Sequence, residues 1–275
     1  MDLQSFFSGL DTLYRTGRAR QAEEYLSAGL ARARAEEDHS ASVSIANESG
    51  GLYRVRGRFP EGVACFQSAL RCLEGSPFDG TEGHAATLLN YATLLTAMGD
   101  LSGAAERFTE TLGMWDALGF PDRGRAAALY NNLAGLRLRQ KQYREALSCI
   151  KQALALLRDI PNSDDEQGVS HTVCAQIQMQ TGESIQALRE LELAEKAFSR
   201  CPDASPIHRA AAAQCRGELG ILEQNWEAAL EAYCRAEELI RAGNGDDSSI
   251  EQLHRRQALC RQNLCCTPEE GGTAL

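Results

Sequence analysis

The amino-acid sequence repeats about every 42 residues, and no other feature constrains its fold as strongly. In each segment a small residue follows a short turn, and these small residues stand at positions 22, 62, 104, 146, 187 and 229. Four residues later, each segment has a large apolar or aromatic residue: Leu26, Phe66, Phe108, Ile150, Leu191 and Tyr233. Six copies in register indicate a repeat architecture, in which each unit packs mainly on its neighbours.

The pattern within a segment predicts a pair of antiparallel helices. Leu147, Ile150, Leu154 and Leu157 recur at the period of one helical face. A further column, three residues beyond the large one, is small in every segment and lets a second helix approach closely: Gly29, Ala69, Thr111, Ala153, Ala194 and Ala236. Prolines such as Pro77 and Pro161 fall between the segments, where they would separate one hairpin from the next.

These columns resemble the tetratricopeptide repeat (TPR), most clearly at 129–154, which reads LYNNLAGLRLRQKQYREALSCIKQAL. The period is longer than the usual ~34 residues of that family and is similar to the longer repeats of kinesin light chains. The resemblance covers about residues 3–242. It implies an all-α fold, a right-handed superhelical α-solenoid of helical hairpins, with six hairpins and a C-terminal capping helix.

The expected domain organisation is a single solenoid over residues 1–266, followed by a flexible tail at 267–275. The six repeats are placed near 3–42, 43–84, 85–126, 127–167, 168–209 and 210–249, and the cap at 250–264.

Charge and cysteine usage limit the class of partner and the compartment. The formal net charge is -10, from 28 Lys and Arg against 38 Asp and Glu, so the chain repels polyanions on average. The N-terminus has no basic start followed by an apolar core, and no apolar run approaches ~20 residues. The ten cysteines are scattered through helix-like segments, which is typical of reduced thiols. We expect a cytoplasmic protein that binds neither nucleic acid nor membranes.

The chemical motifs of common enzymes are missing from the sequence. It contains no phosphate-binding loop, dinucleotide fingerprint, zinc-protease helix or nucleophile elbow. It also contains no C-x-x-C pair, and the five histidines have no closely spaced ligand partners. The acidic run at 164–166 is expected to begin a helix, where the dipole favours negative charge. The sequence therefore predicts no catalytic residues, no metal site and no cofactor.

In the resembling family the first helix of each hairpin lines a concave groove, which implies an amide-rich inner face here. The candidate peptide-binding residues are Asn47, Arg54, Asn90, Thr93, Asn131, Asn132, Arg139 and Gln176. An amide donates to and accepts from a peptide backbone, and an arginine pairs a carboxylate. Glu48 belongs to the same inner face, and Gly51 and Gly135 would let an extended chain approach closely. The alternative is that the asparagines bond across helices or to water and are purely structural.

The leading interpretation is a protein–protein interaction module that binds an extended peptide segment of a partner in its concave groove. The alternative is a homo-oligomeric structural scaffold that uses terminal or convex surfaces, and exposed Leu253 and Leu264 on the last helix would favour it. The inner columns carry no lysine, so we expect no binding of the acidic chaperone tails that shorter repeats recognise. The sequence leaves the oligomeric state open.

Overall fold

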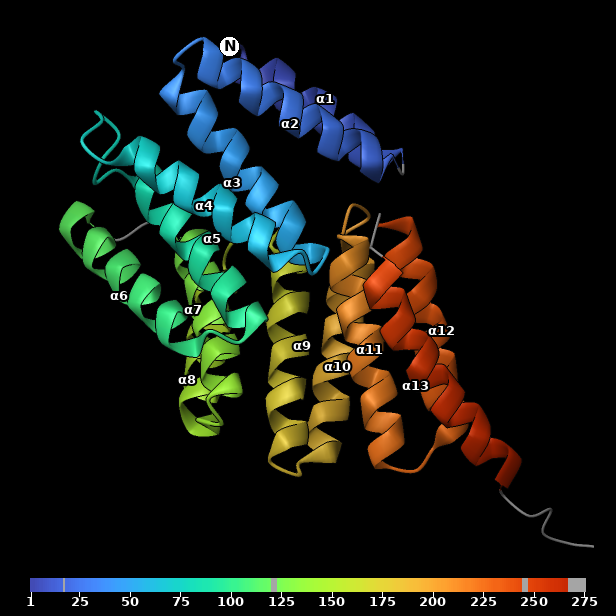
Figure 1. Ribbon diagram of the computed structural model, residues 1–275. Helices are drawn as coiled ribbons and strands as arrows, with labels where there is room; N and C mark the ends of the chain where they lie inside the picture. The colour runs from blue at the N-terminus through green and yellow to red at the C-terminus, as the bar shows by residue number, and fades with distance from the viewer. Residues whose placement is uncertain (17, 120–122, 244–246, 267–275) are drawn as a thin grey trace, which may run out of the picture. The chain divides into compact units, whose positions relative to one another are not determined.

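The computed structural model describes residues 1–16, 18–119, 123–243 and 247–266, and in these ranges the chain forms thirteen α-helices and no strands (Figure 1). The all-α prediction is confirmed. The predicted tail at 267–275 lies outside the described residues.

The helices pair in chain order as antiparallel hairpins, and α13 follows the last pair. Their bounds are α1 (Leu3–Arg15), α2 (Ala19–Ala35), α3 (His39–Val55), α4 (Phe59–Leu73), α5 (Glu82–Met98), α6 (Leu101–Leu118), α7 (Arg123–Arg139), α8 (Tyr143–Leu157), α9 (Asp164–Gln180), α10 (Ser184–Arg200), α11 (Pro206–Leu222), α12 (Trp226–Ala242) and α13 (Asp247–Cys266). The predicted hairpins and capping helix are thus all present.

Contacts between residues divide the chain into two compact units, residues 1–166 and 167–275. The first unit contains the hairpins α1/α2, α3/α4, α5/α6 and α7/α8, and the second contains most of α9 together with α10–α13. Within each unit, neighbouring hairpins share their cores: residues of α5, α6 and α7 form one apolar cluster around Phe108 and Trp115. Residues of α11, α12 and α13 form another around Tyr233, with Trp226 packed against it.

The small and large columns of the sequence are what bring the two helices of a hairpin together. Every large residue of the second helix is buried, and the small residues that precede it are buried too. In α3, position 50 must be glycine because α3 and α4 pack closely there. A Cβ at this position would lie 2.6 Å from the ring of Phe66. In the same way, a Cβ added at Gly217 of α11 would lie 2.8 Å from the ring of Tyr233.

A residue in the left-handed backbone region ends the turn of each described hairpin from the second to the sixth. These residues are Gly57, Gly99, Lys141, Gly182 and Gln224, with φ of 68°, 95°, 60°, 80° and 57°. Side chains then cap several of the following helices. Asp100 accepts a hydrogen bond from the backbone N–H of Gly103, and Asn225 accepts one from Ala228.

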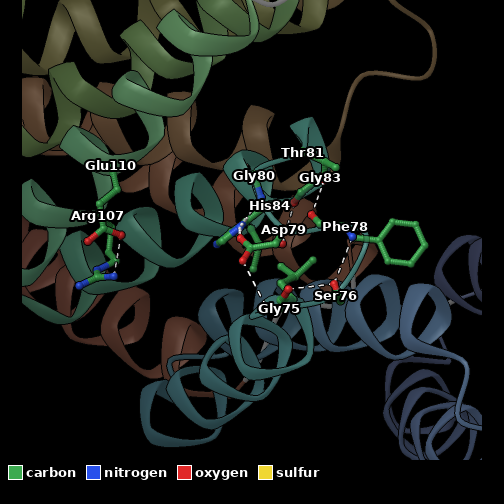
Figure 2. A network of polar contacts seen from close by, with 12 residues as sticks. Gly75, Ser76, Phe78, Asp79, Gly80, Thr81, Gly83, His84, Arg107 and Glu110 are labelled. Carbon is green, nitrogen blue, oxygen red and sulfur yellow. Dashed lines mark hydrogen bonds and ion pairs between the residues drawn. The ribbon is translucent and has the colours of Figure 1, made fainter.

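The joint between α4 and α5 is held by its own polar network (Figure 2). Nδ1 of His84 lies 3.0 Å from Oδ1 of Asp79, and the backbone N–H of Gly75 donates to the other Asp79 oxygen. That backbone hydrogen bond, more than the nearby His84, holds the pKa of the Asp79 carboxyl below its ordinary value. His84 is buried, and its contact with Asp79 helps to close this joint.

The last helix packs on the hairpin before it, which corrects one expectation. Leu253 is only 3% exposed because α13 lays it against α12, so the suggestion that it offers an exposed apolar surface is wrong. Leu264 is half-buried. In the part of the chain that the structure describes, no helix is long and apolar enough to cross a membrane.

Candidate functional site

The first unit has a hollow of about 440 Å³ on the face formed by α3, α5 and α7. It is lined by Ser44, Asn47, Glu48, Gly51, Arg54, Phe66, Asn90, Thr93 and Asn132. Eight of these nine residues come from α3, α5 and α7, the first helices of three successive hairpins. The ninth residue, Phe66 of α4, packs its ring against Gly50 of α3.

The hollow, which we call the α3/α5/α7 hollow, brings together five of the eight candidate residues: Asn47, Arg54, Asn90, Thr93 and Asn132. Asn131 and Arg139 lie on the same helix as Asn132 but do not line it. Gln176 belongs to α9 in the second unit.

Asn47 is held by bonds across helices. Its Nδ2 donates to Oγ1 of Thr87 at 2.9 Å, and its Oδ1 accepts from Nδ2 of Asn90 at 3.3 Å. Thr87 is fully buried and donates in turn to the backbone carbonyl of Gly83. The structural reading of the asparagines therefore applies to Asn47, which joins α3 to α5.

Asn90 and Asn132 keep capacity for another partner. Asn90 is exposed, and its Oδ1 accepts no hydrogen bond within the described residues. Asn132 is half-buried, and its amide makes no hydrogen bond there either. Thr93 donates its hydroxyl proton to the carbonyl of Leu89 at 2.9 Å, so its oxygen remains an acceptor. These three groups offer donors and acceptors of the kind that a peptide backbone needs.

Two charged side chains face the same hollow. Arg54 is half-buried and makes no ion pair or hydrogen bond with the rest of the described chain, and its burial lowers the pKa of its guanidinium. Glu48 accepts a hydrogen bond from the hydroxyl of Tyr14 at 3.2 Å. Burial raises the pKa of the Glu48 carboxyl; the bond from Tyr14 opposes this shift and the nearby Asp11 adds to it.

The surface of α3 is open at Gly51. A Cβ added at Gly51 would meet no atom within 4 Å, in contrast to the tightly packed Gly50 beside it. The same holds for Gly135 on α7. These two glycines are therefore not required for helix packing, and at Gly51 the missing side chain leaves the floor of the hollow accessible.

Sequence reasoning missed two of the lining residues. Ser44 lies one helical turn before Asn47 and Glu48, so continuing the inner stripe of α3 by one turn would have found it. Phe66 was recognised as a core residue, and it is fully buried. Its ring lies where a Cβ of residue 50 would stand, a relation between two helices that no single column of the repeat contains.

The structure gives no sign of a metal centre where it describes the chain. Among these residues, no group of three or more His, Cys, Asp or Glu side chains is placed to hold a metal ion. The nine cysteines whose side chains are described are free thiols, and Cys174, Cys215 and Cys260 among them are buried. The acidic residues 164–166 occupy the first turn of α9, as predicted.

Comparison with known proteins identifies the type of repeat. A sequence profile of the tetratricopeptide repeat matches residues 42–117 and 125–200, more than half of the chain. No curated protein is significantly similar in sequence.

Solved structures share the fold at low sequence identity. BtubC (BKLC) from P. vanneervenii has a TM-score of 0.60 and 17% identity, over 82% of this chain and 92% of that one. A putative kinesin light chain from Podosopora anserina, with nearly identical TPR-like repeats, has a TM-score of 0.54 and 17% identity, over 73% of this chain and 97% of that one. A chain of the APC/C hetero-tetramer Cut9-Hcn1 has a TM-score of 0.63 and 12% identity, over 95% of this chain and 46% of that one. At these identities the likeness concerns the fold alone.

Proposed function

The chain belongs to the tetratricopeptide repeat family, and from that premise we propose that it binds an extended peptide segment of a partner protein in the α3/α5/α7 hollow. Tetratricopeptide repeats in general mediate protein–protein interaction. The observation that carries this proposal is the set of polar groups on this surface without a hydrogen bond in the described chain, namely Oδ1 of Asn90, the amide of Asn132 and the guanidinium of Arg54.

The composition of the hollow favours a peptide over a small apolar ligand. Most of the lining side chains are amides, hydroxyls or charged groups, and the only large apolar one is the edge of Phe66. An extended chain presents a donor and an acceptor at each residue, and successive amides on α5 and α7 match such a repeating ligand.

The test begins with selection of a displayed library of random peptides against the immobilised full-length chain. Peptides of about 12 residues span about 40 Å when extended, enough to cross three neighbouring helices. Synthetic copies of the enriched peptides are then titrated by calorimetry against the wild type, Gly51→Gln and Gly113→Gln. Gly51→Gln fills the open space in the hollow, whereas Gly113 lies on α6, where a Cβ also meets nothing.

We expect Gly51→Gln to weaken binding by more than about tenfold and Gly113→Gln to leave it unchanged. Both variants should fold, because glutamine is a better helix former than glycine. The proposal fails if no peptide is enriched, or if the enriched peptides bind Gly51→Gln as tightly as the wild type.

The alternative of a homo-oligomeric scaffold retains one supporting observation. In the second unit, Ile185 and Leu222 are 68% and 58% exposed, although both are large and apolar. Sedimentation equilibrium at two protein concentrations would show a monomer if peptide binding is the main role. A concentration-dependent mass that Ile185→Ser with Leu222→Ser abolishes would support the scaffold.

Three further assignments belong to this proposal. We expect the chain to act as a binding protein without catalytic activity, to need no cofactor, and to work in the cytoplasm. They follow from the missing motifs, the scattered thiols and the kind of partner that the family binds.

A further inference from the structure

Three arginines stand at alternate positions from the last turn of α3 to the start of α4, and only Arg54 has no counter-ion within the described residues. Arg56 and Arg58 both pair with Glu23 of α2, and Arg58 also reaches Glu61 at 2.8 Å. Arg54 points to the other side, into the α3/α5/α7 hollow, and has no acidic partner among the described residues. The fold thus neutralises two of the three cations and leaves the third in the hollow.

The position of Arg54 makes an external anion favourable. Its guanidinium is half-buried, and it has lost part of its hydration without gaining a charged partner. A carboxylate accepts two parallel N–H donors from a guanidinium. Gly51, one turn earlier on the same helix, leaves room for a ligand backbone to pass close to α3.

The same hollow also limits how much negative charge a ligand can bring. Glu48 lies six residues before Arg54 on α3, about 9 Å along the helix axis, and its bond to Tyr14 keeps it in place. Within the described chain, Glu48 has no cationic partner, and Asp11 of α1 adds to the negative potential around it. A group with two negative charges gains the same single cation as a carboxylate does, but Glu48 repels it about twice as strongly.

We propose that the α3/α5/α7 hollow selects a peptide carrying one aspartate or glutamate, whose carboxylate pairs with Arg54, and that Glu48 disfavours a doubly charged phosphorylated residue at that place. The inference rests on the proposed peptide binding and specifies its ligand. The amides of Asn90 and Asn132 hold the backbone of the segment, and Arg54 sets which side chain is accepted.

The experiment repeats the library selection with three forms of the full chain: the wild type, Arg54→Met and Arg71→Met. Methionine keeps the apolar stem of arginine and removes the charge, and Arg71 is an exposed arginine of α4 outside the hollow. Peptides enriched on the wild type and on Arg71→Met should share one acidic position. Peptides enriched on Arg54→Met should have no preference there.

Matched peptides then give the size of the effect. One enriched peptide is made with aspartate, asparagine or phosphoserine at the shared position. The wild type should prefer aspartate to asparagine by about tenfold or more, and Arg54→Met should bind both equally. The wild type should also bind the phosphoserine peptide more weakly than the aspartate peptide, and Glu48→Gln, which can still accept from Tyr14, should reduce that difference. Circular dichroism of each variant checks that the helices remain.

Failure of this inference can be told apart from failure of the proposed function. If no peptide is enriched on the wild type, both fail. If peptides bind and Gly51→Gln blocks them, but aspartate and asparagine bind equally, only the role of Arg54 is overturned. If phosphoserine binds the wild type more tightly than aspartate does, the role of Glu48 is overturned.

Discussion

At the scale of single residues, glycines opposite aromatic rings decide how closely two helices pack. Gly50 and Phe66 belong to the same hairpin, and the ring occupies the place where a Cβ would stand. The ring of Phe66 also stacks on Tyr91 of α5, with centroids 5.6 Å apart, so it has little freedom to move away.

We predict that Gly50→Ala destabilises the protein by about 1 kcal/mol, because overpacking outweighs the better helix propensity of alanine. In a Phe66→Leu background, which removes part of the ring, the same change should be neutral or stabilising. Urea denaturation of the four proteins in this double-mutant cycle measures the difference. Equal effects of Gly50→Ala in the two backgrounds would contradict the steric account.

Asn47 should contribute to stability, whereas Asn132 should contribute to peptide binding. Asn47→Ala should cost about 1 kcal/mol of stability because Thr87 and Asn90 lose a partner. Asn132→Ala should leave the stability unchanged, because that amide makes no bond within the described chain, and should weaken the enriched peptides in calorimetry. A structural role for all the asparagines would instead show as a loss of stability in both variants with no loss of binding in either.

Five of the eight candidate residues from the sequence lie together in the α3/α5/α7 hollow. The sequence did not show which of them form hydrogen bonds within the chain. Periodicity puts Asn47, Asn90 and Asn132 on inner helix faces, yet whether an amide is engaged depends on a neighbour in the next hairpin. Thr87 was not singled out, because a buried threonine in a helix has the same pattern as any small core residue.

At the scale of helices and turns, the turns of the second to the sixth hairpin each contain a left-handed residue, and in two of these hairpins the residue is not glycine. Lys141 and Gln224 have φ of 60° and 57°, which costs a residue with a Cβ about 1 kcal/mol or more. We predict that Gln224→Gly raises the stability by up to about 1 kcal/mol. Thermal unfolding should show a higher midpoint.

The neighbouring residue is the control for this prediction. Glu223 has φ of -86°, so Glu223→Gly gains no relief and should lower the stability by about 0.5–1 kcal/mol. If both variants shift the midpoint in the same direction, backbone strain at position 224 is not the cause.

The docking of α13 depends on one carboxylate of α12. Glu237 accepts hydrogen bonds from Gln257 at 2.9 Å and from Arg241, and His254 lies 3.1 Å from it. The bond from Gln257, followed by those from Arg241 and His254, lowers the pKa of Glu237 from 4.5 to about 2. Because the folded-state pKa is depressed, this contribution to stability is present above the unfolded pKa and is lost as the pH falls through the folded one.

We predict that α13 loses protection from amide hydrogen exchange between about pH 4.5 and 2, after correction for intrinsic exchange rates. Glu237→Gln should show lower protection of α13 already at neutral pH and little further change on acidification. A wild-type α13 that remains fully protected at about pH 2.5, near the acid end of this range, would refute the role of this carboxylate.

At the scale of the whole molecule, the repeat predicted the number and order of the helices, because each hairpin is specified by its own small and large columns. It gave no sign of a division near residue 166, since the period continues through that point without a break. The division into two compact units depends on how many contacts form across each joint between hairpins. The repeated small and large positions do not predict that number. That residues 1–266 act as one continuous solenoid stays a prediction.

The division has a consequence for stability that exchange can measure. Phe108→Ala removes a buried ring from the core of the first unit and should cost about 3–5 kcal/mol there. Because contacts in repeat proteins are mainly between neighbours, we expect amides of α5–α7 to lose protection while those of α11–α13 keep theirs. Equal loss in both units would mean that the chain unfolds as a single cooperative body.

Of the two tryptophans in the sequence, one belongs to each unit: Trp115 in the α5–α7 core and Trp226 beside the α11–α13 core. Each unit therefore carries its own intrinsic fluorophore. Trp226→Phe leaves an indole that is 1% exposed and should emit at short wavelength until the first unit opens, and Trp115→Phe leaves one that reports the second unit. A denaturant titration followed by emission alone would then give a separate midpoint for each half of the chain, without labels or truncation.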